Sequence, residues 1–196
     1  GMSTEEAARE LRYQCFKQAM KKSGASKVAV AHHKNDQAET ILFHMCRGSG
    51  PDGLSGMRPV REFVIRPMLC LGREQIESYL SACGWDYVTD ETNESTIYSR
   101  NRLRIEVFPV LEEICPGAGA HIAATGEDMA QLSGYLREQI CRAVEECVQQ
   151  TDPDEAVMKM SCQRLGGLHP YLQGEVVRAC LFEQAGQKKD ISAVKS

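Results

Sequence analysis

A short apolar run between two helical patterns constrains the fold of this chain more than any other feature. Residues 27–31 are Lys-Val-Ala-Val-Ala, and helical patterns flank them at 3–22 and 36–47. A valine-rich run of this length is typical of a buried strand in a parallel sheet. The order helix, strand, helix therefore predicts an α/β sheet, and a further strand is expected at 63–66.

The rest of the chain carries mainly helical patterns. Apolar spacing predicts three helices, at 73–83, 104–114 and 170–184. A longer apolar stripe at 122–148 predicts the core of a helical hairpin or bundle. The clearest boundary is Pro116-Gly117-Ala118-Gly119. We therefore expect an α/β domain with a parallel sheet over residues 1–115, followed by an all-α domain over residues 116–196.

Composition excludes several classes of protein. The chain has 23 Lys and Arg residues against 27 Asp and Glu residues, a formal net charge of −4. This balance argues against a surface that is basic throughout, although it allows a local basic site. No apolar run approaches the ~20 residues of a membrane span, and no basic and apolar leader opens the chain. We expect a cytoplasmic protein without a membrane partner.

The nine cysteines are scattered, and no C-x-x-C pair occurs among them. This pattern favours neither a disulfide framework nor a zinc site. In a cytosolic chain we expect reduced thiols that serve mostly as small core residues, and no metal ligands among them.

Residues 48–53 match G-x-G-x-x-G, a pattern that binds dinucleotides when it joins a strand to a helix. Here the pattern follows a predicted helix, and Pro51 removes one of the amides that could donate to phosphate. A surface turn is the better interpretation.

The polar residues after the first strand form the most informative cluster. His32, His33, Asp36 and Glu39 lie between the carboxyl end of that strand and the first turn of a helix, where open α/β sheets bind ligands. Free amides and imidazoles there suit a phosphate. The two carboxylates, one turn apart, suit an ammonium group or a metal on a nucleotide, or they only cap the helix. A structural role is the more frequent one for His33 and for His44.

Arginine is the only basic residue between positions 47 and 104. Arginine is preferred where planar, bidentate contact with phosphate or carboxylate is needed. On a helix, Arg100 and Arg104 would share one face, whereas Arg102 is expected to face solvent. These features predict a site for a phosphate-bearing ligand.

Several ordered motifs closely resemble the tRNA(Ile)-lysidine synthetase family of the PP-loop ATP-pyrophosphatase superfamily. The motifs are Glu6-x-Ala8-Arg9-x-x-Arg12-Tyr13, His32-His33-x-x-Asp36-Gln37-x-Glu39-Thr40, Arg47-Gly48-Ser49-Gly50, Gly53-Leu54-x-Gly56-Met57, Arg66-Pro67-Met68-Leu69, Asp90-x-Thr92-Asn93, Arg100-Asn101-x-x-Arg104 and Pro109-x-Leu111. The resemblance implies a partial adenine-nucleotide-hydrolase-like, Rossmann-like sheet. The segment after residue 115 resembles the family's substrate-binding domain only in position and pattern.

The resemblance also implies a C–N-bond-forming ligase that uses ATP and Mg²⁺. Such an enzyme adenylates the C2 oxygen of the wobble cytidine in the CAU anticodon of tRNA(Ile), and the amine of L-lysine then displaces AMP to give lysidine. Asp36 and Glu39 would hold and deprotonate the amine, and Arg100, Arg104 and His32 would stabilise charge on phosphates or on the adenylated base. The implied catalytic residues are Asp36, Arg100 and Arg104, and the implied substrate-binding residues are His32, Glu39, Arg47, Arg66, Asn93 and Asn101.

The family's S-G-G-x-D-S loop, which grips the ATP phosphates, does not occur in this chain. We therefore expect the chain alone to bind ATP poorly and not to complete the reaction, and its incomplete sheet to favour self-association. Two alternatives stay open. One is a tRNA-thiolating PP-loop enzyme, for which only Cys46 and Cys70 are candidate nucleophiles, and the other is a non-catalytic RNA-binding or assembly module.

Overall fold

The computed structural model describes residues 4–88, 99–149 and 158–184. By its packing the chain divides into two compact units, one of residues 1–40 and 57–123 and one of residues 41–56 and 124–196. This division places the glycine-rich segment with the C-terminal part of the chain. The functional boundary expected after residue 115 stays a prediction.

The first unit contains a three-stranded mixed sheet in the order β1, β3, β2. β1 (Val28–Ala29) pairs parallel with β3 (Val64–Ile65), as the sequence predicts, with Val28 opposite Val64. The expected burial of this strand is wrong, because Val28 is only half-buried and Ala29 is exposed. β2 (Val60–Arg61) pairs antiparallel with β3, so the sheet is not parallel throughout. The sequence does not predict β2, because a strand of two residues is too short to show an alternating pattern.

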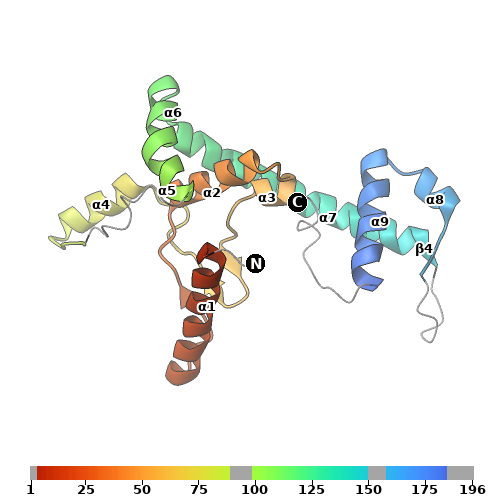
Figure 1. The fold of residues 1–196 in the computed structure, drawn as a ribbon, viewed down its shortest axis with the longest axis horizontal. Helices are drawn as coiled ribbons and strands as arrows, with labels where there is room; N and C mark the ends of the chain where they lie inside the picture. Colours follow the sequence, from red (N-terminus) through yellow and green to blue (C-terminus); the bar gives the residue numbers. More distant parts are fainter. Residues whose placement is uncertain (1–3, 89–98, 150–157, 185–196) are drawn as a thin grey trace. The chain divides into compact units, whose positions relative to one another are not determined.

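Helix α1 (Thr4–Ser23) packs beside this sheet (Figure 1). The ring of Tyr13 lies 6.0 Å from the ring of Phe63, and Lys17 Nζ lies 5.7 Å from the centre of the same ring. Gly24, with a φ of 72°, ends the helix in the left-handed conformation that glycine adopts most easily. The predicted helix at 3–22 is therefore confirmed.

Two further helical segments complete the first unit. α4 (Arg73–Ala82) matches the predicted helix at 73–83. The helix predicted at 104–114 begins earlier, because α5 (Ser99–Arg102), the π-helical turn η2 (Leu103–Val107) and α6 (Phe108–Ile114) follow one another directly. Pro109 lies in the first turn of α6 and cannot donate to the carbonyl of Ile105 four residues earlier, which favours the wider π turn at this point.

Helix α2 (Lys34–Cys46) leads into the glycine-rich segment of the second unit. Gly48 turns the chain with a φ of 74°, and Pro51 opens α3 (Pro51–Leu54), a single helical turn. The Nδ1 atom of His44 lies 2.6 Å from the Gly53 carbonyl oxygen, which gives that histidine a structural role. Because a helix precedes the turn, the G-x-G-x-x-G pattern lacks the strand that a dinucleotide site requires.

The core of the second unit lies between α7 (Ala118–Cys147) and α9 (Pro170–Gln184), which crosses the C-terminal half of α7 (Figure 1). The core residues are Ala143, Cys147, Val176 and Cys180. The apolar stripe at 122–148 belongs to one helix of 30 residues, except for Val148, which begins β4. The segment is not all-α, because β4 (Val148–Gln149) and β5 (Lys159–Met160) form an antiparallel pair before α8 (Cys162–Gly166).

All nine cysteines are free thiols, but only Cys147 and Cys180 are buried. The prediction that most cysteines are core residues is therefore wrong. A scattered cysteine on an amphipathic helix can lie on either face, and composition alone does not decide which. In the three described ranges, no helix is long and apolar enough to cross a membrane.

Candidate functional site

The candidate site in the first unit lies where β1 leads into α2. The chain leaves the parallel pair after Ala29 and enters α2 at Lys34, so His32 and His33 lie at the carboxyl end of a strand. Asp36 Oδ2 accepts a hydrogen bond from the His33 backbone N–H at 3.0 Å, and the Asp36 N–H donates to His33 Nδ1 at 3.4 Å. These reciprocal contacts form a capping box in which His33 is the N-cap residue.

The capping box therefore begins three residues earlier than the Asp36 and Glu39 pattern suggests, and Glu39 is left for another partner. Arg104 Nε donates to Glu39 Oε1 at 2.6 Å, and Arg104 Nη2 donates to Glu39 Oε2 at 2.9 Å. Arg104 Nη2 also donates to Asp36 Oδ1 at 3.0 Å. The Glu39 side chain is only 4% exposed and that of Arg104 is 30% exposed. One guanidinium thus holds both carboxylates in a largely buried, bidentate arrangement.

Arg100 reaches the same helix from α5. Its Nη2 atom donates to Thr40 Oγ1 at 3.0 Å, and that hydroxyl donates to the Asp36 carbonyl at 2.8 Å. The hydrogen bonds that Arg104 donates to the Glu39 carboxylate raise the pKa of Arg104 above its usual value. The result is a cluster of charged groups along one face of α2.

His32 lies beside a second arginine. Arg66 Nε donates to His32 Nδ1 at 3.3 Å, and Arg66 Nη1 donates to the Arg58 carbonyl at 2.8 Å. Because Nδ1 accepts this hydrogen bond, the neutral ring carries its proton on Nε2. Burial lowers the pKa of His32 below 6.5, and the charges of Arg66, Arg100 and Arg12 lower it further against the opposing effect of Asp36. His32 is therefore a neutral hydrogen-bond donor near neutral pH.

Three predicted residues contribute differently. Arg47 belongs to the second unit, where its guanidinium lies 5.2 Å from the centre of the Phe43 ring. Asn101 lies in α5 between Arg100 and Arg102. Asn93 lies outside the described residues. The structure thus brings Asp36, Glu39, Arg100 and Arg104 together at α2 and places His32 with Arg66.

Three residues that belong to the motifs quoted above, but that received no role from the sequence, contribute to this site. The Gln37 side chain exchanges two hydrogen bonds with the Met57 backbone, at 2.7 and 3.1 Å, and so fixes the segment that follows Gly56. Thr40 receives Arg100, and Arg12 contributes positive charge near His32. A signal for the first two exists in the sequence, because polar residues in the middle of a buried helix need partners.

The residues present do not form a metal site. In the part of the chain that the structure describes, no group of three or more His, Cys, Asp or Glu side chains could hold a metal ion. The two carboxylates of α2 already accept hydrogen bonds from Arg104. The cluster instead contains carboxylates, which can accept hydrogen bonds from a cation, and guanidiniums, which can donate to an anion.

Comparison with known proteins shows the family of the chain. The model of the PP-loop domain matches residues 1–111, more than half of the chain. The chain belongs to the PP-loop domain family. This match spans the mixed sheet, α2 and η2, and therefore every residue of the candidate site in the first unit.

Curated relatives extend the comparison beyond the PP-loop domain. Proteins named tRNA(Ile)-lysidine synthase are 45% identical over 146 residues in Parabacteroides distasonis and 40% identical over 153 residues in Thermotoga maritima, covering 73% and 76% of this chain. A protein of that name from Dehalococcoides mccartyi is 38% identical and covers 98% of this chain. The chain spans only 33%, 35% and 42% of the length of these three relatives.

Proposed function

We propose that this chain is part of an ATP-dependent ligase that joins L-lysine to the C2 atom of the wobble cytidine in tRNA(Ile). ATP would adenylate the C2 oxygen with release of pyrophosphate, and the lysine amine would then form the C–N bond as AMP leaves with that oxygen. The names of the relatives and the PP-loop match support this proposal. The observation that carries it is the cluster of Asp36, Glu39 and Arg104, which combines groups suited to an amine and to a phosphate.

The two carboxylates of α2 would bind and deprotonate lysine. An ammonium group must lose a proton before it can attack carbon. Asp36 is the better base, because its side chain is 15% exposed whereas that of Glu39 is 4% exposed. Glu39 would hold the amine in place for the attack.

Arg104 now lies where a lysine ammonium would bind. A guanidinium and an ammonium are both cations that donate to carboxylate oxygens, so they compete for Asp36 and Glu39. We infer that Arg104 turns toward phosphate when the nucleotide is present and so releases the carboxylates to lysine. Its partial exposure leaves it room to do so. Nucleotide should therefore strengthen the binding of lysine.

Arg100 and His32 would act on the anionic side of the reaction. Arg100 is an exposed arginine held by the Thr40 hydroxyl, and the Nε2–H of neutral His32 can donate to a phosphate oxygen without requiring a charge. ATP is expected as a substrate of a PP-loop enzyme, and Mg²⁺ would accompany it. No step is assigned to the metal, because the described residues do not form a site for it.

Transfer of radiolabelled lysine to a tRNA(Ile) transcript with a CAU anticodon tests the function. The protein for this assay carries a segment with the family's S-G-G-x-D-S loop in front of the chain. We expect lysine transfer by this protein, loss of transfer with Asp36→Asn, and retention of transfer with Arg102→Met. A protein that binds ATP and this tRNA but transfers no lysine would contradict the proposal.

Calorimetric titration of lysine tests the competition. We expect tighter lysine binding when a non-hydrolysable ATP analogue is present, and Arg104→Met should remove this dependence because no guanidinium then blocks the carboxylates. Arg102→Met is the matched control, since Arg102 pairs with Glu106 on the exposed side of the same helical run. Equal lysine affinity with and without nucleotide in the unaltered protein would refute the exchange.

A further inference from the structure

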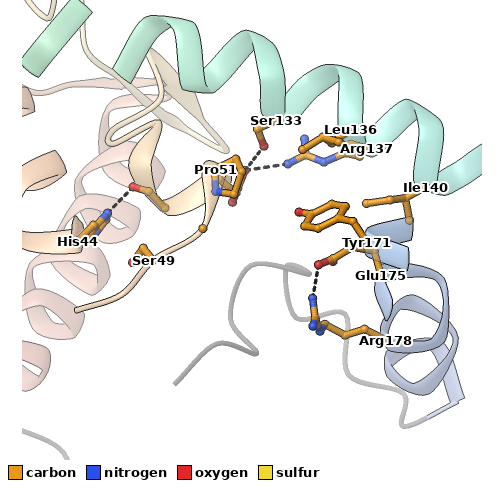
Figure 2. Close-up of a pocket in the computed structure, with 13 residues that line it drawn as sticks. His44, Ser49, Pro51, Ser133, Leu136, Arg137, Ile140, Tyr171, Glu175 and Arg178 are labelled. Atoms are coloured by element: carbon orange, nitrogen blue, oxygen red, sulfur yellow. Dashed lines mark hydrogen bonds and ion pairs between the residues drawn. The ribbon is translucent and has the colours of Figure 1, made fainter. Parts of the chain in front are cut away.

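A cleft in the second unit lies outside the site described above. Its volume is about 310 Å³, and it lies between the α3 turn, the middle of α7 and the first turns of α9 (Figure 2). All of its lining residues fall within 41–56 and 124–196, the two segments of the second unit. The volume is at the lower end of the range for small-molecule sites, so it suits a single small group.

The charges in the cleft are balanced in pairs. Asp52 Oδ1 accepts hydrogen bonds from Ser133 Oγ at 2.9 Å and from Arg137 Nη2 at 3.0 Å. Glu175, which is buried, pairs with Arg178 one turn later on α9. Each arginine is thus matched by a carboxylate, and the four charges sum to zero. A phosphate group would have to separate one of these pairs, so the cleft does not favour an anion.

Apolar side chains and an aromatic ring line another part of the cleft, beside His44 and Ser49. Tyr171 points from α9 into the cleft, toward Pro51 and the side of α7 that carries Leu136 and Ile140 (Figure 2). Burial raises the pKa of Tyr171 and keeps its hydroxyl protonated. The cleft therefore presents an aromatic face, aliphatic walls, and hydrogen-bond donors and acceptors at its rim.

We propose that this cleft binds an unpaired nucleobase of RNA, stacked on the ring of Tyr171. A base is planar and neutral, and its edge alternates donors with acceptors. The Asp52–Arg137 and Glu175–Arg178 pairs can serve such an edge without separating, because a carboxylate accepts several hydrogen bonds and a guanidinium has five N–H donors. Stacking on aromatic side chains is the general way in which proteins hold single-stranded bases.

A free amino acid fits the same charges less well. Its carboxylate and ammonium groups are full charges, so each would have to take a partner from one of the two internal pairs. It also has no flat surface to place against Tyr171. The proposal rests on the proposed function in one respect only, since a tRNA-modifying enzyme meets unpaired bases as part of its substrate.

The test compares two short single-stranded RNAs that have the same sugar–phosphate backbone, one with bases and one abasic throughout. We expect the unaltered chain to bind the base-bearing RNA about 5- to 150-fold more tightly, the range for stacking of one base on an aromatic ring. Fluorescence anisotropy of a labelled RNA measures this difference. Tyr171→Ala should remove it, whereas Tyr171→Phe, which keeps the ring, should preserve it.

Tyr135→Ala is the matched control. Tyr135 is another tyrosine of the second unit, 58% exposed on α7 and absent from the lining of the cleft, so its loss should leave the difference unchanged. Equal binding of the two RNAs by the unaltered chain would overturn the proposal, as would an equal effect of the Tyr171 and Tyr135 substitutions. Displacement of the base-bearing RNA by L-lysine but not by cytidine would instead identify an amino-acid site and also overturn it.

A second measurement needs no variant. Base-bearing RNA that contains 4-thiouridine is irradiated with the unaltered chain, and we expect cross-links to peptides that contain Tyr171 or Pro51. Cross-links confined to other peptides would refute the assignment. If lysine is transferred but RNA binding does not depend on Tyr171, only this inference is refuted. If RNA binding depends on Tyr171 but no lysine is transferred, only the proposed function is refuted.

Discussion

Replacement of Arg104 tests the electrostatic core of the candidate site. Arg104→Met removes the guanidinium but keeps a side chain of similar length. Glu39, whose side chain is 4% exposed, then loses two charge-assisted hydrogen bonds, and Asp36 loses one. Two carboxylates one turn apart on α2 would be left without the cation between them.

The expected loss of stability follows from burial. Removal of one partner of a buried ion pair costs about 3–5 kcal/mol, because a charge is left without compensation in a poorly solvated place. Arg104 is 30% exposed, so water can replace part of the lost contacts. We therefore expect Arg104→Met to lower the free energy of unfolding by about 2–4 kcal/mol.

Urea unfolding followed by circular dichroism measures this loss. Arg102→Met is the control, because Arg102 pairs with Glu106 at an exposed position and its replacement should cause no measurable change. Glu39→Gln combined with Arg104→Met should recover about 1–3 kcal/mol relative to the sum of the two single changes, since the neutral side chain needs no cation. The reasoning is refuted if Arg104→Met costs no more than Arg102→Met, or if the double variant is no more stable than additivity allows.

Three further outcomes are expected. Gly126→Ala should lower the free energy of unfolding, measured by thermal melts, by about 1–3 kcal/mol, because a Cβ there would lie 2.3 Å from Cδ1 of buried Ile41. Ile41→Val, added to this change, should relieve the clash. Gly134→Ala should instead stabilise the chain, because nothing lies within 4 Å of its Cβ. Burial and neighbouring arginines lower the pKa of His32, so just below pH 6.5 the folded chain binds fewer protons than the unfolded chain. The urea midpoint should therefore fall as the pH decreases from 6.5 toward the lowered pKa. His32→Asn should flatten that decline. Backbone N–H groups of Gly119 and Gly117 lower the pKa of Glu112. The stability that this carboxylate adds to the start of α7 should therefore be present above pH 4.5 and lost at lower pH. The melting temperatures of Glu112→Gln and of the unaltered chain should converge at that lower pH.

The longer elements of the fold follow from local patterns. Helix α9 begins at Pro170 and ends at Gln184 as predicted, and the parallel pairing of β1 with β3 follows from an apolar run that precedes a helix, although that run is not buried. Strands β2, β4 and β5 are two residues long, and no periodicity can be recognised over two residues. Their pairing depends on contacts that only the folded chain brings together.

The site could be predicted in its residue types but not in its pairings. Asp36 and Glu39 fit both a capping box and a cation site, and sequence spacing does not distinguish the two. The structure assigns the capping contacts to His33 and Asp36, while Glu39 pairs with Arg104, which lies 65 positions further along the chain. Arg104 reaches Glu39 because η2 lies against α2 in the folded chain. No local sequence pattern describes that contact.

The buried polar residues of α2 would also limit how the candidate site binds the proposed substrates. Gln37, Glu39 and Thr40 lie beside Ala38 and Ile41 in the most buried stretch of the helix, and each has a partner from a distant part of the chain. A lysine ammonium can therefore gain the carboxylates only to the extent that Arg104 gives them up. If nucleotide draws Arg104 away and strengthens lysine binding by some factor, then lysine must strengthen nucleotide binding by the same factor. An affinity for nucleotide that does not change with lysine would show that the two ligands do not act through Arg104.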